Sequence, residues 1–208
     1  MDINIIDFIC KKIKTIFIIC GAFGPIILFF TSIYILWLEK RESYIYYYII
    51  GFVFNSLINI FLKAVIQQPR PGIDMDAHIF EQRLKTKLKM KNGIPFNLFG
   101  MPSGHAQAVA YSITYIALAS IFSDDFLSMI RKKNWIIRNA LWIYSILLII
   151  TCIQRVISNE HTPFQVLCGL IVGIGIGYAT FYFTKQKIKT IPREKPDDNC
   201  FIGGTHPL

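Results

Sequence analysis

Five long apolar runs, each with at most one charged residue, constrain the fold of this 208-residue chain more than any other feature. Each run has about the 20 residues that a helix needs to cross a bilayer. Lipid offers no hydrogen-bond partner to exposed peptide groups, so segments that cross it must be helical. The sequence therefore predicts an all-α, integral membrane helical bundle with about five transmembrane helices. The expected spans are Thr15–Leu38, Ser43–Leu62, Pro102–Ser123, Ile136–Ile153 and Pro163–Thr184.

The segments outside these runs are shorter or more polar. Residues 1–14 carry apolar residues at helical spacing and predict a short N-terminal interfacial helix, too short to span. Residues 1–184 are expected to form one membrane-embedded domain, followed by a polar, disordered tail over residues 185–208. Between the second and third spans, basic residues alternate with apolar ones in residues 72–100. This loop predicts a solvated interfacial helix or, alternatively, a segment that gathers anionic substrate.

The chain has a net charge of +9, from 22 Lys and Arg against 13 Asp and Glu. In a membrane protein this excess favours anionic lipid surfaces and phosphate-bearing substrates as partners, and not nucleic acid. The five cysteines show no paired spacing, so the sequence predicts neither a disulfide framework nor a zinc site. Nothing in the sequence indicates an oligomeric state.

Chain order places four polar segments at the ends of these spans. Lys63–Pro71 follows the second span, Pro102–His105 opens the third, Arg155 ends the fourth and His161 precedes the fifth. With five spans, all four positions fall on the same membrane face. Lys and Arg number 11 on each face, so the positive-inside rule gives a tie. If the basic residues of the polar segments are not counted, the C-terminus is expected to be cytoplasmic and the polar face luminal or external.

The first polar segment contains Lys63 and Arg70. A lysine at a helix end often does no more than reach for the interface, and this interpretation and a functional one are equally open for Lys63. Arg70 lies between Pro69 and Pro71, which fix the backbone around a side chain that can hold phosphate with two donors. The pattern indicates an anion site.

The second segment is Gly100-Met-Pro-Ser-Gly-His, at the start of a helix. Free N–H groups and the positive end of the helix dipole favour an anion there, and Gly104 allows it to approach the backbone. Ser103 could also act as an ordinary helix cap without any other function. His105 is not explained by a cap, because an ionisable group one turn inside a membrane helix is costly and usually functional.

The third segment runs from Arg155 to Gln165 and includes His161. Thr162 and Gln165 have the spacing of a capping box, in which Gln165 only closes the helix start. His161 and Gln165 also lie four residues apart, so the glutamine carbonyl could instead hold the imidazole N–H. Both interpretations remain open because one carbonyl cannot serve both fully.

Together the three segments, K-x6-R-P, P-S-G-H and R-x5-H, resemble the signature of the type 2 phosphatidic acid phosphatase superfamily, over roughly residues 40–182. The resemblance implies a metal-independent lipid phosphatase without cofactor that forms a phosphohistidine intermediate. It implies that His161 is the nucleophile and His105 the acid that protonates the leaving oxygen. It also implies that five residues bind the phosphoryl oxygens: Lys63, Arg70, Ser103, Gly104 and Arg155.

Two residues depart from the common pattern of the superfamily, since Gln154 stands in place of a serine and Gln165 in place of an aspartate. The dolichyldiphosphatase-like branch resembles this chain more closely, with glutamine at the position of Gln165 and a glycine-rich last helix. Gly104 departs from that branch, which tends to have serine there. The branch implies hydrolysis of a polyprenyl diphosphate to the monophosphate, in the endoplasmic reticulum if the source is eukaryotic. The alternatives are a broad phosphatidate or lipid monophosphate phosphatase, and a non-catalytic lipid-phosphate binder.

Overall fold

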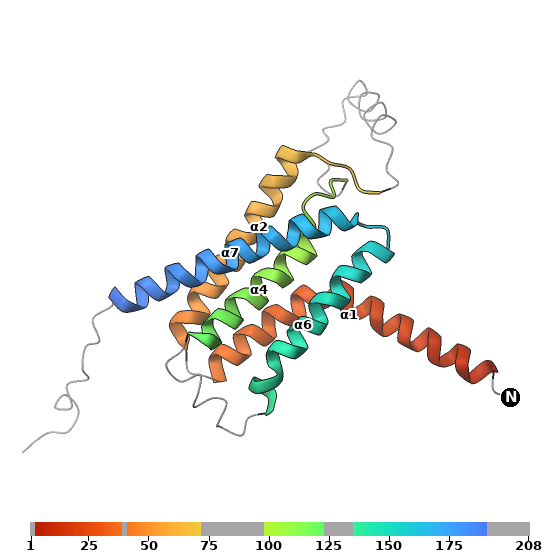
Figure 1. Ribbon diagram of the computed structural model, residues 1–208, viewed down its shortest axis with the longest axis horizontal. Coiled ribbons are helices and arrows are strands. Elements are labelled where there is room, and N and C mark those ends of the chain that lie inside the picture. The colour runs from red at the N-terminus through yellow and green to blue at the C-terminus, as the bar shows by residue number, and fades with distance from the viewer. Residues whose placement is uncertain (1–2, 39–40, 72–97, 123–134, 191–208) are drawn as a thin grey trace, which may run out of the picture.

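The computed structural model describes residues 3–38, 41–71, 98–122 and 135–190, and these residues form five helices without a β-strand. Figure 1 shows the helices as one bundle. The all-α prediction is confirmed for the described part of the chain. The helices are, in chain order, α1 (Ile3–Leu38), α2 (Glu42–Ile66), α4 (Gly104–Ile121), α6 (Trp135–Ile157) and α7 (Pro163–Thr190).

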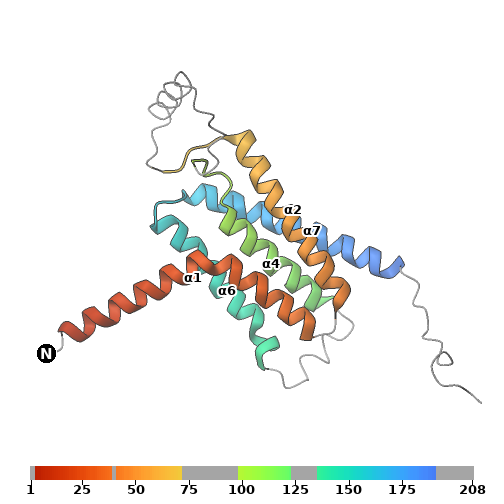
Figure 2. The same ribbon diagram turned by 180° about the vertical axis from the view of Figure 1, so that it is seen from behind.

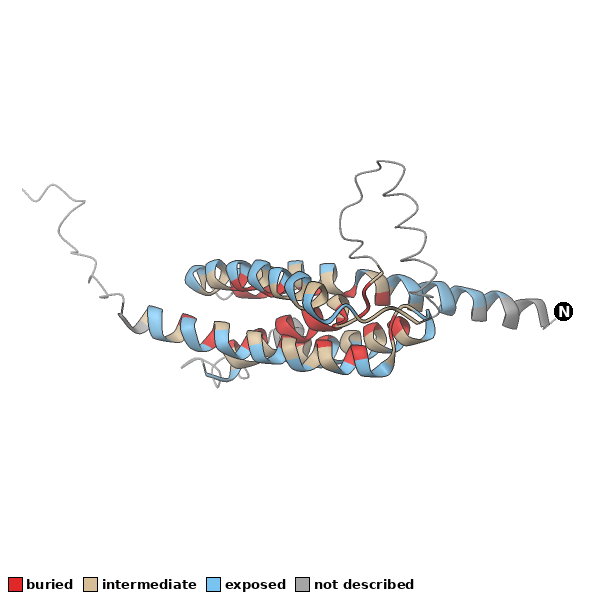
Figure 3. Cartoon of the chain, turned by 90° about the horizontal axis from the view of Figure 1, so that it is seen from above, coloured by how far each residue is buried: buried red, intermediate tan, exposed pale blue. Residues whose placement is uncertain are grey.

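Four of these helices are long and apolar enough to cross a membrane. Large apolar side chains cover their outward faces, and representatives from each helix are more than 60% exposed: Phe30, Phe61, Trp142 and Ile171. Figure 3 shows the buried residues on the inside of the bundle and the exposed ones around it. An apolar surface of this extent requires lipid around it, so the chain is an integral membrane protein. The four segments are Lys11–Leu38, Glu42–Ile66, Asn139–Ile157 and Pro163–Ile188.

The third predicted span corresponds to α4, which is not among these four helices. This helix packs against α1, α2, α6 and α7, and 10 of its 18 residues are buried. Figure 1 shows it in the middle of the bundle. A helix that is enclosed by other helices need not be as apolar as one that faces lipid. It therefore accommodates polar residues such as Gln107 and Ser112, both fully buried.

Three glycines of α7, spaced four residues apart, allow α7 to pack closely on α4. A Cβ atom on Gly169 would lie 2.5 Å from the Ser103 carbonyl oxygen, and one on Gly173 would lie 2.2 Å from that of Gln107. Gly177 has the same relation to Tyr111, at 2.9 Å. Small residues at this spacing are a common way for membrane helices to approach each other. The contact fixes the start of α7 against the start of α4.

The first helix differs from its prediction. Residues 1–14 were expected to form a separate interfacial helix, but Ile3–Leu38 is one continuous helix, since no proline or glycine interrupts it before Gly21. Figures 1 and 2 show that α1 bends midway and that its N-terminal part leaves the bundle. Pro25 lies inside the helix and removes one backbone hydrogen bond there, which accounts for the bend.

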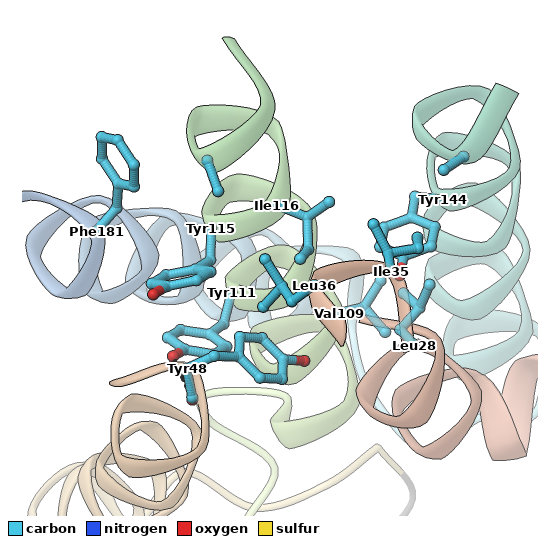
Figure 4. Packing of buried hydrophobic residues seen from close by; sticks show 12 residues of the cluster. Leu28, Ile35, Leu36, Tyr48, Val109, Tyr111, Tyr115, Ile116, Tyr144 and Phe181 are labelled. Carbon is cyan, nitrogen blue, oxygen red and sulfur yellow. Dashed lines mark hydrogen bonds between the residues drawn. The ribbon is translucent and has the colours of Figure 1, made fainter. Parts of the chain in front are cut away.

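A cluster of buried aromatic residues fills the bundle between α2, α4 and α7. Tyr48, Tyr111 and Tyr115 are fully buried and lie with ring centroids 5.4–6.2 Å apart (Figure 4). Each hydroxyl has a partner. Tyr48 pairs with the Ser112 hydroxyl at 2.8 Å, Tyr111 donates to the Tyr48 carbonyl at 2.8 Å, and Tyr115 donates to the Tyr44 carbonyl at 2.9 Å. Buried hydroxyls that are all hydrogen-bonded stabilise a core without leaving an unpaired group.

The end of the last helix differs from its prediction. The last helix was expected to end at Thr184, and it continues to Thr190 because the polar residues after Thr184 include no helix breaker before Pro192. The rest of the predicted tail, and the basic loop over residues 72–97, lie outside the described residues.

Candidate active site

The three polar segments meet at one end of the bundle, where α2 and α6 end and α4 and α7 begin. Backbone and side-chain hydrogen bonds join each segment to another, and an ion pair joins Arg70 to Glu160. The convergence that helix counting predicted is therefore confirmed. Segments nearly 100 residues apart in sequence form one site.

A short antiparallel bridge joins the first and second segments. The α2 helix ends at Gln67, whose left-handed backbone (φ 50°) lets its N–H donate to the Lys63 carbonyl. The chain then pairs with residues 98–100: Arg70 N–H donates to the Leu98 carbonyl at 3.0 Å, and Gly100 N–H donates to the Gln68 carbonyl at 2.8 Å. The bridge fixes the backbone on both sides of Pro69, and thereby the origin of the Arg70 side chain.

Gln165 connects all three segments. Its Nε2 donates to the Pro69 carbonyl at 2.9 Å and its backbone carbonyl accepts the Ser103 N–H at 3.1 Å. Its Oε1 accepts the Thr162 N–H at 3.1 Å, while its own N–H donates to the Thr162 hydroxyl at 3.2 Å. The side chain is completely buried, and a Cβ atom on Gly100 would lie 2.4 Å from Oε1. A larger residue at position 100 would force the Gln165 side chain out of this position.

These hydrogen bonds decide between the two predicted partners of the Gln165 side chain, Thr162 and the His161 imidazole. The reciprocal bonds between Thr162 and Gln165 are the capping box, which is confirmed. The alternative bond from Gln165 to the His161 imidazole is not formed, because the amide oxygen and nitrogen are occupied by Thr162, Gln68 and Pro69. The His161 Nδ1 atom is buried and has no partner. Gln165 lies at the site, but it does not contact the imidazole as the second interpretation required.

The start of α4 presents Ser103 without the bond expected of a helix cap. Ser103 occupies the N-cap position, yet its side chain makes no capping hydrogen bond and its Oγ is completely buried without a partner. Asn59 on α2 supports the loop before it, because its Nδ2 donates to the Pro102 carbonyl at 3.2 Å and to the Gln107 Oε1 at 2.8 Å. Gly104 lies against the same asparagine, 3.1 Å from its Oδ1 to an ideal Cβ.

A tight turn after α6 places His161 beside Arg155. The N–H groups of Glu160 and His161 both donate to the Arg155 carbonyl at 3.2 Å. Asn159 has a left-handed backbone (φ 55°), which asparagine adopts more readily than most residues. The turn reverses the chain between α6 and α7, and His161 becomes almost fully buried at 2% exposure.

Basic side chains surround His161 and keep its imidazole neutral. Burial lowers the pKa of His161 to about 4, and the charges of Arg70, Arg155 and Lys63 act in the same direction. A hydrogen bond with the Gly100 backbone has the opposite, smaller effect on this pKa. A neutral imidazole has a lone pair available for attack near neutral pH. The same cationic groups would attract an anionic substrate.

Four buried polar atoms in the three segments have no hydrogen-bond partner. They are Arg70 Nε, Ser103 Oγ, Arg155 Nε and His161 Nδ1. Buried polar atoms in folded proteins are rarely left unpaired, and those that are call for an explanation. Two further such atoms among the described residues belong to Thr151 and Gln154, on the α6 face that packs against Gly24 and Gly21 of α1. The donors concentrated at the site match the oxygens of a phosphoryl group.

His105 lies near this group and is oriented by the first helix. The charges of Arg155, Glu160 and Lys63 act on it, so it shares their surroundings. Its Nε2 lies 3.2 Å from the Ala22 carbonyl, three residues before Pro25 in the bent turn of α1. A carbonyl oxygen only accepts, so Nε2 carries the proton in this contact. The bend in α1 thus contributes a backbone acceptor to the site.

Three residues at the site were not identified from the sequence: Gln68, Asn59 and Glu160. Gln68 accepts a bond from Gln165 at 3.3 Å, and Glu160 contacts both Arg70 and Arg155. Glu160 was identifiable in principle, since it directly precedes His161 and could serve as a counter-charge to the basic residues. Asn59 lies one turn before Lys63, in the middle of an apolar run, and no local pattern distinguishes it from other polar residues of the helix.

Comparison with known proteins agrees with the arrangement. The family model described as the PAP2 superfamily matches residues 43–189, which include all three segments. A dolichyldiphosphatase of Saccharomyces cerevisiae is 28% identical over 132 residues, which cover 64% of this chain and 48% of that protein. The chain thus spans about half the length of this relative. No solved structure matches the chain significantly. Because the family model covers well over half of its residues, the chain belongs to the PAP2 superfamily.

Proposed function

We propose that this chain is a membrane lipid phosphatase that hydrolyses a polyprenyl diphosphate to the monophosphate through a phosphohistidine at His161. The family membership supports a phosphatase, and the similarity to the yeast dolichyldiphosphatase supports the polyprenyl diphosphate as substrate. The observation that carries the proposal is the set of unpaired buried atoms on Arg70, Ser103, Arg155 and His161, with the charge of Lys63 beside them. These groups suit the charge and the oxygens of a phosphoryl group.

In the proposed reaction, an imidazole nitrogen of His161 attacks the terminal phosphorus, and the bond from that phosphorus to the leaving oxygen breaks. His105 gives a proton to the leaving lipid monophosphate, and water then hydrolyses the phosphohistidine. Lys63, Arg70 and Arg155 balance the charge of the transferred group, and Ser103 and the Gly104 N–H bind its oxygens. No metal takes part in this scheme. Gln165 holds the three segments in register.

A second candidate is a lipid-phosphate binder without turnover. It is favoured by the unpaired Nδ1 of His161, since no carboxylate or side-chain amide bonds to that nitrogen. An orienting partner sets the tautomer and raises the basicity of a histidine nucleophile. The binder shares the anion site with the first proposal and differs only in catalysis.

Rapid acid quench with a polyprenyl diphosphate labelled in its terminal phosphate distinguishes these candidates. The phosphatase predicts acid-labile label on the wild-type protein and none on His161→Ala. Wild-type protein that binds the substrate but takes up no label and releases no phosphate would leave only the binder. Parallel release assays with phosphatidate identify a broad lipid monophosphate phosphatase, which would hydrolyse both substrates at similar rates.

For the membrane orientation, we propose a cytoplasmic C-terminus and a luminal or external site. This rests on the distribution of Lys and Arg, once Lys63, Arg70 and Arg155 are assigned to the site. Labelling of a cysteine placed at Gln67 with an impermeant reagent in sealed vesicles tests it. In vesicles whose cytoplasmic face is outward this cysteine should be protected, and its labelling there would contradict the orientation.

A further inference from the structure

The Glu160 carboxylate lies between the two arginines of the proposed phosphate site. One oxygen, Oε2, makes an ion pair with Arg70 Nη1 and lies 3.2 Å from Arg155 Nη2. The arginine side chains are 22% and 10% exposed, and that of Glu160 is 38% exposed. The carboxylate therefore reaches inward from the rim of the site.

A carboxylate oxygen and a phosphoryl oxygen make the same kind of contact with arginine. Both accept charge-assisted hydrogen bonds from the planar guanidinium group. An oxygen that two guanidinium groups share is thus where a phosphoryl oxygen would bind. Glu160 uses only part of the hydrogen-bonding capacity of the two guanidinium groups, because Arg70 Nε and Arg155 Nε remain unpaired. The site retains donors for an anion with more oxygens and more charge.

The Glu160 side chain can move away from the two arginines. Its backbone is held by the bond from its N–H to the Arg155 carbonyl, within the turn that follows α6. Among the described residues, its side chain makes hydrogen bonds and ion pairs only with the two arginines. Rotation of the side chain toward solvent would release both arginines without moving the turn.

We propose that Glu160 is an internal competing anion: its carboxylate holds Arg70 and Arg155 in the free protein and is displaced when the phosphoryl group binds. This rests on the proposed function, because it assumes that the two arginines bind the phosphoryl group. Displacement of a carboxylate favours ligands with more than one negative charge over monoanions such as phosphodiesters. Glu160 is thereby a specificity-determining residue, because its negative charge competes with weakly charged ligands for the two arginines.

The test measures the affinity of the purified protein in detergent for inorganic phosphate, by isothermal titration calorimetry at constant pH and ionic strength. Glu160→Gln keeps the shape of the side chain and removes its charge. We expect the Kd for phosphate to fall roughly tenfold in this variant, as for loss of a close competing charge pair. Glu42→Gln, at the opposite end of α2, is the matched control and should leave the Kd unchanged.

A second measurement gives an effect of the opposite sign. Without phosphate, Glu160→Gln should unfold at a lower temperature than the wild type, because two close guanidinium groups lose their shared counter-charge. Saturating phosphate should remove this difference, because the proposed displacement takes the carboxylate off both arginines in the bound protein. If the glutamine variant does not fold, Glu160→Asp draws the carboxylate back by one methylene, and its Kd should lie below that of the wild type.

A Kd for phosphate that is unchanged or higher in the variants would overturn the inference, since Glu160 would then position the arginines and not compete with the ligand. If the wild type also hydrolyses its lipid substrate, that result leaves the proposed function intact. If neither wild type nor variant binds phosphate and the wild type hydrolyses no lipid phosphate, the proposed function fails, and this inference fails with it.

Discussion

The two ends of the bundle both bury polar groups, but they treat them differently. Around Tyr48, Tyr111 and Tyr115 every buried hydroxyl has a hydrogen-bond partner from a neighbouring helix. Around His161 and Ser103 four buried polar atoms have none. A satisfied network adds stability and needs no ligand, whereas an unsatisfied one is costly unless something binds to it. Burial of polar residues alone therefore does not mark a site, and the difference lies in their unpaired atoms.

Arg70→Gln should produce the largest effect and should separate function from stability. It removes a phosphoryl-binding guanidinium group from the proposed site, so kcat/KM for the lipid substrate should fall about 100- to 1000-fold. The thermal unfolding temperature should change little, because Glu160 keeps its contact with Arg155. Phosphate release and thermal unfolding in the same detergent measure the two effects. A large loss of stability with normal kcat/KM would show that this end is structural as well.

Gln165→Glu should affect the connection between the three segments. The variant keeps an acceptor for the Thr162 N–H. It loses the N–H groups that donate to the Pro69 carbonyl and to Gln68 Oε1. We expect roughly a tenfold loss in kcat and about 1–3 kcal/mol in unfolding free energy, because a buried acceptor then faces other acceptors. Gln165→Met is the control, because it also removes the donor but introduces no charge. Full activity in both variants would mean that the segments keep their positions without this residue.

Tyr111→Phe tests the other end of the bundle. It removes the hydroxyl that donates to the Tyr48 carbonyl and leaves the ring in place. The free energy of unfolding should fall by about 1 kcal/mol, and kcat and KM should not change. Denaturant unfolding and steady-state kinetics check both. A change in kcat would link the tyrosine cluster to the site.

The low pKa of His161 predicts a dependence of stability on pH. The His161 imidazole has a pKa of about 4 in the folded protein, whereas in the unfolded chain it titrates near 6.5. Between these values the unfolded state binds more protons, so this histidine makes the folded protein less stable as the pH falls from about 6.5 to 4. His161→Asn should therefore lose less stability than the wild type over that interval. Equal slopes of unfolding temperature against pH would contradict the low pKa.

The sequence allowed much of the fold and site to be predicted, for identifiable reasons. Long uncharged runs predict membrane helices because lipid excludes charge, and helix counting alone brought Lys63, His105 and His161 to one face. The side-chain partners were less predictable. Gln165 had two possible partners of similar local quality, Thr162 and His161, and the one that formed depends on Pro69, nearly 100 residues away. The bend of α1 could be suspected from Pro25, but not its contact with His105.

By itself, the sequence determined the order of the long apolar helices and the types of residue that meet at their ends, because hydropathy and helix breakers act locally. Tertiary structure alone decided which polar atoms found partners. The glycine face of α7 brings Gln165 to Ser103, the turn at Asn159 brings Glu160 between two arginines, and each contact depends on how whole helices pack. Hydrogen-bond partners over such distances follow from packing geometry, which no single segment encodes.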